Sequence, residues 1–312
     1  MRAVTIRDKD VVVEEHPDPR PGSGEVLVGV HAAGLNGADM MQRRGFYPAP
    51  PGSPPDIPGL ELAGEVAALG DGAERFAVGD RVMAIVGGGA QAELATVHER
   101  QLMPVPSALA WPAAGGLPEV FTTAHDALFT QAELRSGESL LVHGGAGGVG
   151  TAAIQLAVAA GARVTATVRR EELRDQVAAL GASAIAPEEF AAHGPFDVVL
   201  ELVGAPNFAE NLSAIATGGR IAIIGVGGGA KAEINLLALM GKRARIHGST
   251  LRARPLEEKA IASRRLERQV LPLFESGAVH VPVAETFALD DARAAYERFA
   301  AGGKLGKIVL TL

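Results

Sequence analysis

The sequence predicts an α/β protein of two domains, one rich in β-strands and one built as a doubly wound parallel sheet. A chain of 312 residues is long for a single hydrophobic core and suits two domains. The first hundred residues consist of short strand-like runs, whereas strands and helices alternate from about Trp111 onward. Because such alternation builds parallel βαβ units, the second part of the chain is expected to form the doubly wound sheet.

The first hundred residues are predicted to be mostly strand, since their apolar residues are β-branched or alternate with polar ones. Between Tyr47 and Pro58 lies a proline-dense loop, which can be neither a central strand nor a helix interior. Long irregular loops in compact domains are often functional. The predicted strands are Ala3–Ile6, Val11–Glu15, Val26–His31, Leu62–Ala68, Val82–Val86 and Ala92–Val97.

The alternating region contains apolar strand-like runs, several of them followed by a helical pattern that ends at a glycine. The predicted strands are Leu140–His143, Arg163–Val168, Asp197–Leu202, Arg220–Ile224 and Ala244–His247. The predicted helices are Val149–Ala160, Glu171–Leu180, Asn207–Ile215 and Leu236–Met240.

The C-terminal part is predicted to begin with a helix over Pro255–Phe274 and to end with strand, helix and strand. Asp290 is expected to cap a helix over Asp291–Ala300, and Lys307–Leu312 to form the closing strand. A tail of β character suggests that the chain returns to its first domain. The predicted domains are therefore 1–112 with 253–312, and 113–252.

Composition excludes several classes of protein. The chain has no cysteine, which rules out disulfides, thiolate catalysis and cysteine-ligated zinc. Its net charge of −7, with acids and bases interspersed, argues against nucleic acid as a main partner. Residues 1–20 lack the apolar block of a signal peptide, and no apolar run is long enough to span a bilayer. We expect a cytoplasmic protein without a membrane partner.

A glycine-rich turn after the first strand of the alternating region predicts a dinucleotide site. Gly145–Gly150 satisfies G-x-G-x-x-G, with a strand before it and a helix after it. The glycines permit a tight turn, a close approach of backbone to pyrophosphate, and close packing of helix on strand. The N-terminus of the helix then offers free N–H groups and partial positive charge to the anion.

The end of the next strand predicts which cofactor is bound. A site that prefers NAD has Asp or Glu there, to hold the ribose 2′-hydroxyl. In this chain the strand continues into Arg169 and Arg170, whose guanidinium groups suit a 2′-phosphate. This pattern favours NADPH over NADH, although two arginines on a surface turn can also be merely solvated.

Four segments carry a likeness to a known family: Ala32–Asp39 (A-G-x-N-x-x-D), Pro58–Val66 (P-G-x-E-x-x-G-x-V), Leu117–Ala124 and His143–Gly150. With them the whole chain resembles the zinc-independent quinone oxidoreductases, the zeta-crystallin-like group of the medium-chain dehydrogenases/reductases. The resemblance implies a GroES-like β-rich catalytic domain and a Rossmann nucleotide-binding domain. Within the group, Met40–Arg43, Gly87–Glu93 and Ser249–Arg254 are most similar to the tumour-suppressor-inducible branch of animals.

By this resemblance, Asn36 and Tyr47 should lie near the nicotinamide, in a cleft between the domains. Asn36 could orient an amide or an acceptor carbonyl, or be a polar turn residue. Tyr47 could cover the ring or donate a hydrogen bond, or pack on the prolines around it. The resemblance adds cofactor contacts at Thr123, Ala146, Gly147, Gly148, Val149, Ile224, Gly225, Val226, Ser249, Thr250 and Leu251.

Thr123, and two arginines that follow Leu251, could also have roles unrelated to the cofactor. Thr123 could instead cap the helix that follows it. Arg252 and Arg254 could steer an anionic ligand, but solvated surface arginines are the favoured interpretation.

The likeness also indicates what chemistry is absent. Related zinc alcohol dehydrogenases hold a catalytic zinc with a cysteine and a histidine, where this chain has Asn36 and Leu60. Zinc activation of an alcohol is therefore not expected, and no metal site is predicted. Hydride transfer from NADPH to a quinone is the leading hypothesis. Reduction of an α,β-unsaturated carbonyl (an enone or an enoyl thioester) is the alternative, and a redox-sensing or structural cofactor-binding protein is the non-enzymatic one.

An edge strand predicts a partner. The strand Ala244–His247 should lie at the edge of the nucleotide-binding sheet, and open edges tend to be covered or paired. In the family that edge commonly joins a second subunit, so the resemblance implies a homodimer.

Overall fold

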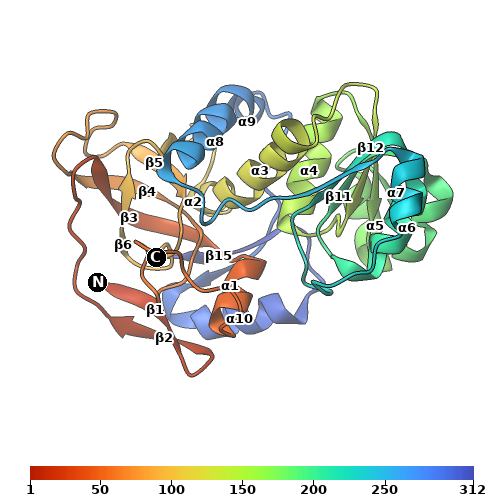
Figure 1. Cartoon of the computed structure of the whole chain (residues 1–312). Helices are drawn as coiled ribbons and strands as arrows, with labels where there is room; N and C mark the ends of the chain where they lie inside the picture. Colours follow the sequence, from red (N-terminus) through yellow and green to blue (C-terminus); the bar gives the residue numbers. More distant parts are fainter. The chain divides into compact units, whose positions relative to one another are not determined.

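The computed structural model describes every residue of the chain, 1–312, as two compact units (Figure 1). The first unit comprises Met1–Thr122, Leu251–Gly302 and Lys307–Leu312, and the second comprises Thr123–Thr250 and Gly303–Gly306. No helix of the chain combines the length and the apolar character that a membrane span requires.

The division between the units differs from the sequence prediction at each boundary. Residues 113–122 belong to the first unit because helix α2 (Trp111–Gly115) packs on strands β3 (Glu25–Gly34) and β4 (Glu61–Leu69) of that unit. Residues 303–306 belong to the second unit, where the N–H of Gly306 donates to the carbonyl of Ala146 at 2.8 Å.

The first unit is built on a mixed sheet in the order β14-β15-β3-β4-β5-β7, with β6 also paired to β3. Strand β3 alternates buried and partly exposed residues along most of its length, as a strand does that covers a core with one face. A separate antiparallel hairpin joins β1 and β2. The remaining strands are β1 (Arg2–Arg7), β2 (Asp10–Glu15), β5 (Arg81–Ile85), β6 (Leu94–His98), β7 (Met103–Pro104), β14 (Val283–Ala288) and β15 (Lys307–Thr311).

The helices of the first unit depart from the prediction in two places. The predicted helix Pro255–Phe274 is broken into α8 (Leu256–Gln269) and α9 (Leu271–Glu275), because Pro272 has no N–H to continue the ladder. The cap predicted at Asp290 is wrong: this residue lies inside the 3₁₀ turn η5 (Leu289–Asp291) and pairs with Arg2 at 3.1 Å. The other helices are α1 (Gly37–Arg43) and α10 (Ala292–Ala301).

Helix α3 (Pro118–His125) crosses the division between the units and continues into a π-helical segment, η1 (Asp126–Gln131). Thr123 lies in the last turn of α3, so its position is not that of a residue that caps the start of a following helix.

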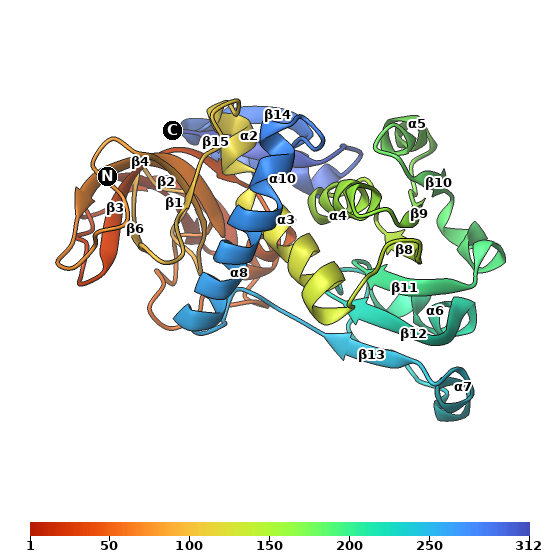
Figure 2. The ribbon, with the colours of Figure 1, turned by 90° about the horizontal axis from the view of Figure 1, so that it is seen from above.

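The second unit is the predicted doubly wound sheet, six parallel strands in the order β10-β9-β8-β11-β12-β13. Figure 2 shows β10 and β13 at its opposite edges, with α5 beside the first and α7 beside the second. The strands are β8 (Ser139–His143), β9 (Arg163–Thr167), β10 (Ser183–Ile185), β11 (Phe196–Glu201), β12 (Ile215–Ile223) and β13 (Arg245–Gly248). The helices are α4 (Gly148–Ala159), η2 (Glu171–Leu173), α5 (Arg174–Ala178), η3 (Pro187–His193), η4 (Ala205–Asn207), α6 (Phe208–Ala214) and α7 (Leu236–Lys242).

The strand order places a switch point between β8 and β11. The chain proceeds from β8 to one side through β9 and β10, and then returns to β11 on the other side of β8. In open parallel sheets, ligands bind at the carboxyl ends of the strands where the winding direction reverses. The glycine loop that follows β8 lies at this point.

Candidate functional site

The glycine loop has the geometry of an anion cradle. Gly147 is the N-cap of α4, with φ of −74° and ψ of 169°, and α4 begins at Gly148. A Cβ on Gly150 would lie 2.4 Å from the carbonyl oxygen of Gly144, so only glycine permits the close packing of α4 against the loop. The N–H groups in the first turn of a helix have no partner within the helix. They therefore form, with the helix dipole, a site suited to a pyrophosphate.

A buried polar cluster holds the strand ends beneath this loop. The imidazole of His143, at the end of β8, bonds Asn211 at 2.7 Å and the hydroxyl of Thr167 at 3.1 Å. The carboxylate of Glu201, at the end of β11, accepts from the amide of Asn211 at 2.7 Å and from the N–H groups of Val203 and Gly204 at 2.7 Å each. Burial lowers the pKa of His143, which favours the neutral ring. His143 is thus a structural histidine of the loop.

The other predicted cofactor residues of the second unit follow the carboxyl ends of its strands. Arg169 and Arg170 are exposed after β9, and the Arg170 side chain lies over the backbone of Gly303. Ile224, Gly225 and Val226 follow β12, and the N–H groups of Ile224 and Gly225 both donate to the carbonyl of Glu201. After β13, the N–H of Ser249 donates to the carbonyl of Ile223 at 3.2 Å, and Thr250 ends the unit. Leu251 lies in the first unit, buried against Ile85 and Ala262.

In the first unit, Asn36 belongs to a buried charged cluster. Lys307 donates from its ammonium to the Glu61 carboxylate at 2.6 Å, to the Asn36 side-chain oxygen at 2.7 Å and to the carbonyl of Leu35 at 2.7 Å. The Asn36 amide donates in turn to Glu61 at 2.9 Å and to the carbonyl of Gly34 at 3.3 Å. Both amide hydrogens are therefore used inside the protein, and Asn36 has only its oxygen to offer a further ligand.

Glu61 also ties this cluster to the next segment of chain. Its second carboxylate oxygen accepts from the backbone N–H of Glu119, in the first turn of α3, at 2.8 Å. Glu61 is fully buried, and the side chain of Lys307 is 3% exposed. Two opposite charges without water are stable only when they are paired and hydrogen-bonded as these are.

Asp39 provides a second buried carboxylate in the same unit. It accepts from the N–H of Asn36 at 2.8 Å and from the N–H of Gly59 at 3.0 Å. Burial raises the pKa of Asp39 to about 6, against the lowering effect of these two hydrogen bonds and of Lys307 and Arg252. Through these bonds Asp39 connects the turn at Asn36 with the end of the proline-dense loop.

Arg252 holds the proline-dense loop at Tyr47. Its guanidinium donates to the carbonyl of Tyr47 at 2.9 Å, to the carbonyl of Gly87 at 2.7 Å and to the side-chain oxygen of Gln42 at 2.5 Å. The same group lies 4.9 Å from the centre of the Tyr47 ring, in cation–π contact. Burial lowers the pKa of Arg252 and raises that of Tyr47, whose ring is only partly exposed.

The favoured interpretation of Arg252 as a solvated surface arginine is wrong, because it is 3% exposed. Sequence reasoning also missed the roles of Asp39, Glu61 and Lys307. Asp39 and Glu61 lie inside two of the motifs that carry the family likeness. Their acidic side chains could therefore have been considered as candidate site residues. Nothing near Lys307 in the sequence indicates its partners, because Asn36 and Glu61 are far away along the chain.

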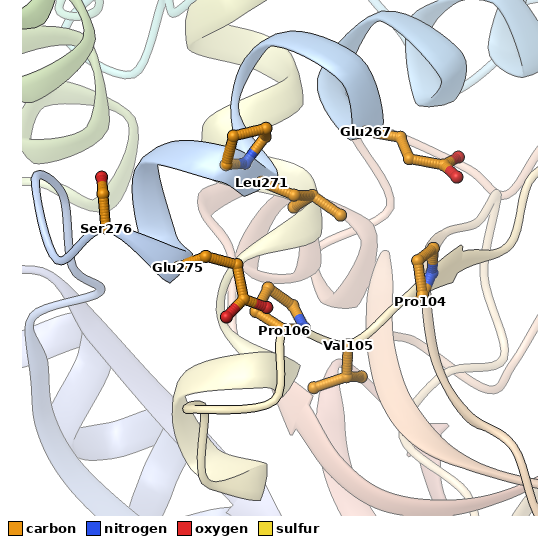
Figure 3. Close-up of a pocket in the computed structure, with 8 residues that line it drawn as sticks. Pro104, Val105, Pro106, Glu267, Leu271, Glu275 and Ser276 are labelled. Atoms are coloured by element: carbon orange, nitrogen blue, oxygen red, sulfur yellow. The ribbon is translucent and has the colours of Figure 1, made fainter.

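A separate hollow of about 570 Å³ lies elsewhere on the first unit, between the segment after β7 and helices α8 and α9 (Figure 3). Val105, Leu271 and three prolines form much of its wall, and Glu275 is held by the N–H and hydroxyl of Ser107. None of its lining residues belongs to the polar clusters around Asn36 or Arg252. This hollow is therefore separate from the clusters that contain the predicted site residues of the first unit.

The donor set does not suit a metal ion. No three His, Asp or Glu side chains of the chain come together in a way that could hold one. Of the two positions where the zinc enzymes have ligands, Asn36 contacts the ammonium of Lys307 and the carboxylate of Glu61, and Leu60 is buried in the core. The Lys307 ammonium already compensates the Glu61 carboxylate.

Comparison with known proteins agrees with this geometry. A family model described as an alcohol dehydrogenase GroES-like domain matches residues 22–107, and one described as a zinc-binding dehydrogenase matches residues 148–268. Quinone oxidoreductase of Rattus norvegicus is 34% identical over 97% of this chain and 92% of its own length. Acryloyl-coenzyme A reductase of Metallosphaera sedula is 30% identical over the full length of both chains.

Solved structures give the same result. An alcohol dehydrogenase superfamily protein of Novosphingobium aromaticivorans superposes with a TM-score of 0.90 at 32% identity, over 100% of this chain and 99% of its own. A mycobacterial protein in complex with NADPH superposes with a TM-score of 0.88 at 28% identity, over 100% of both chains. The chain, with its GroES-like and Rossmann-type folds, is thus an oxidoreductase that belongs to the medium-chain dehydrogenase/reductase family.

Proposed function

We propose that this oxidoreductase transfers hydride from NADPH to a quinone without the help of a metal ion. The observation that carries the proposal is that Asn36 and Leu60 occupy the positions where the zinc enzymes of the family have metal ligands, and that Asn36 is hydrogen-bonded to the buried Lys307–Glu61 ion pair. A quinone is electron-poor and needs alignment with the hydride donor more than activation by a metal. Several curated relatives that match over most of the chain are named quinone oxidoreductase, which supports this choice.

In this proposal the second unit holds the cofactor. The free N–H groups at the start of α4 bind the pyrophosphate, helped by Ala146, Gly147, Gly148 and Val149. The guanidinium groups of Arg169 and Arg170 bind the 2′-phosphate. The bound cofactor supplies the hydride, and the protein supplies position and electrostatics. Tyr47, held by Arg252, is the residue of the first unit that we propose to face the acceptor. Asn36, which has only its side-chain oxygen available, is proposed to accept from the carboxamide of the nicotinamide.

Reduction of an α,β-unsaturated thioester is the second candidate, because a full-length relative is named acryloyl-coenzyme A reductase. A stopped-flow assay of NADPH oxidation against a panel of quinones, small enones and enoyl thioesters decides between the two. The proposal expects the highest kcat/KM with a quinone. A higher value with an enoyl thioester would replace it by the second candidate, and no turnover with any acceptor would refute both.

The cofactor assignment makes a prediction about Arg169 and Arg170. Replacing both by alanine should lower kcat/KM for NADPH by about 100-fold, because two charge-assisted contacts to the 2′-phosphate are lost. The value for NADH should stay within about threefold of wild type. Steady-state kinetics with both cofactors measures the ratio. Arg174→Ala, which removes a nearby arginine bonded to the carbonyl of Val168, should leave the ratio unchanged.

If the Arg169→Ala/Arg170→Ala variant lost activity equally with NADH and NADPH, the two arginines would not bind the 2′-phosphate. If the wild type already used NADH as well as NADPH, the preference for NADPH would be wrong.

We also propose that two copies of the chain pair along β13. This strand bonds β12 on one side and forms the edge of its sheet, and the neighbouring α7 exposes Leu236, Leu237 and Met240 to 63%, 77% and 70%. Apolar side chains so exposed beside an open edge suit burial against a second copy.

Sedimentation should give a particle of about twice 32.1 kDa. Leu237→Glu with Met240→Glu should shift it to the monomer, while Val78→Glu, at a 65% exposed valine of the first unit, should not. A wild-type monomer would refute the dimer.

A further inference from the structure

Five arginines line a hollow of about 580 Å³ on the first unit. They come from three segments: Arg75 from the loop between β4 and β5, Arg100 from the turn between β6 and β7, and the others from α8. The full lining is Arg75, Arg100, Arg264, Arg265, Arg268, Ala260, Ile261 and Gln269. A hollow of this volume is in the range of small-molecule sites.

Ion pairs and backbone contacts fix the position of several of these arginines. Arg75 contacts the Glu267 carboxylate at 2.7 Å, and Arg264 contacts the same carboxylate at 3.0 Å. Both also donate to the carbonyl of Leu102, Arg75 at 2.9 Å. Arg100 pairs with Glu257, in the first turn of α8. The guanidinium groups are therefore positioned by the fold before any ligand arrives.

The carboxylates do not use all of the donors. The Nε of Arg264 is buried without a hydrogen-bond partner, and its Nη1 makes an ion contact but no well-aligned hydrogen bond. A buried guanidinium N–H without a partner costs free energy, and several cations brought together repel one another. An anion bound among the guanidinium groups would reduce this repulsion.

The arginine-lined hollow is distinct from the site around Tyr47. Lys259 lies on the side of α8 where the charges of Arg252 and Glu119 act on its ammonium group. Burial lowers the pKa of Lys259. At 3.6 residues per turn, Ile261, Arg265 and Arg268 lie on roughly the opposite side of the helix. A ligand in the hollow is therefore separated by α8 from the proposed acceptor residues.

We propose that this hollow binds a small ligand that carries two or more phosphate groups, such as a nucleoside diphosphate. Guanidinium groups bind phosphate oxygens through paired donors, and three arginines on one helix face opposite two from loops can surround a diphosphate. Ala260 and Ile261 give the hollow an apolar surface for the organic part of the ligand, and Ile261 is 50% exposed. The ligand would join α8 to the two loops of the β-sheet.

Isothermal titration calorimetry of the full chain with inorganic pyrophosphate and with ADP, each in excess NADPH, tests the proposal. The NADPH is present because the glycine loop could also bind these probes. Wild type should bind ADP, with an affinity that falls as salt rises. Arg265→Ala with Arg268→Ala should weaken binding by at least about tenfold. The control Arg20→Ala with Arg293→Ala removes two exposed arginines elsewhere on the unit and should change nothing.

Three results would overturn the proposal. The first is the absence of binding to wild type in excess NADPH, and the second is equal binding by wild type and the Arg265→Ala/Arg268→Ala variant. The third is loss of binding in the Arg169→Ala/Arg170→Ala variant, which would place the probe in the cofactor site. The hollow and the proposed function fail independently, because this assay measures binding and the acceptor panel measures turnover.

Discussion

Replacing Lys307 by methionine should lower the free energy of unfolding by about 3 to 5 kcal/mol. The substitution keeps most of the side-chain volume but leaves the Glu61 carboxylate, which is fully buried, without its compensating charge. The carbonyl of Leu35 and the side-chain oxygen of Asn36 lose their donor as well. Chemical denaturation of wild type and variant measures the difference in unfolding free energy, provided that this free energy has the same dependence on denaturant concentration in both proteins.

The cause can be separated from a simple packing defect by a double-mutant cycle. Glu61→Gln with Lys307→Met removes both charges, so it should recover part of the stability that Lys307→Met loses. Lys231→Met, at an exposed lysine, controls for loss of a surface charge and should stay within about 0.5 kcal/mol of wild type. If the loss of unfolding free energy in the double variant equalled the sum of the losses in Glu61→Gln and Lys307→Met, the ion pair would not be the source of the effect.

The glycine loop was predictable because all of its determinants are local. A buried strand, a fixed pattern of glycines and a helical pattern follow one another within Leu140–Ala160, and the steric demand at Gly150 involves Gly144, a few residues away. The doubly wound sheet was predictable for a related reason, since alternating strands and helices permit few other arrangements.

The cluster around Lys307 was not predictable from local pattern. Asn36 follows β3, Glu61 begins β4 and Lys307 begins β15, and they meet only because β15 returns to pair with β3. Lys307 occurs in a glycine-rich stretch that would suit a solvated lysine equally well. The charge of a residue can be read from the sequence, but its burial depends on pairing across the whole chain.

Local capping rules failed at Asp290 for a similar reason. Aspartate before a helical run predicts an N-cap, but here a 3₁₀ turn precedes α10 and the Asp290 carboxylate faces Arg2 at the other end of the chain. The ion pair connects residues 288 positions apart in the sequence. A long-range contact of this kind has no local signal.

Replacing Arg252 by methionine should lower both stability and turnover. Three acceptors, the carbonyls of Tyr47 and Gly87 and the side chain of Gln42, lose a charged donor in a site that is almost without water. The free energy of unfolding should fall by about 3 kcal/mol or more. Because Tyr47 is then no longer held, kcat/KM for the best acceptor should fall by about 100-fold, the scale of effect that a small misplacement of a positioning residue has.

Turnover is measured well below the unfolding transition, so that the two effects are read separately. Arg252→Lys keeps the charge but has a single nitrogen in place of the planar guanidinium group. Its kcat/KM should therefore fall nearly as far as that of Arg252→Met. Arg254→Met, two residues away with an ion contact of 3.8 Å to Glu258, is the matched control and should change kcat/KM by less than about threefold. If Arg252→Met retained nearly wild-type kcat/KM while losing stability, Arg252 would support the fold without positioning Tyr47 for the reaction. A fall in kcat/KM for Arg252→Met and Tyr47→Phe alike, without additivity in the double variant, would instead place the two residues in one functional unit.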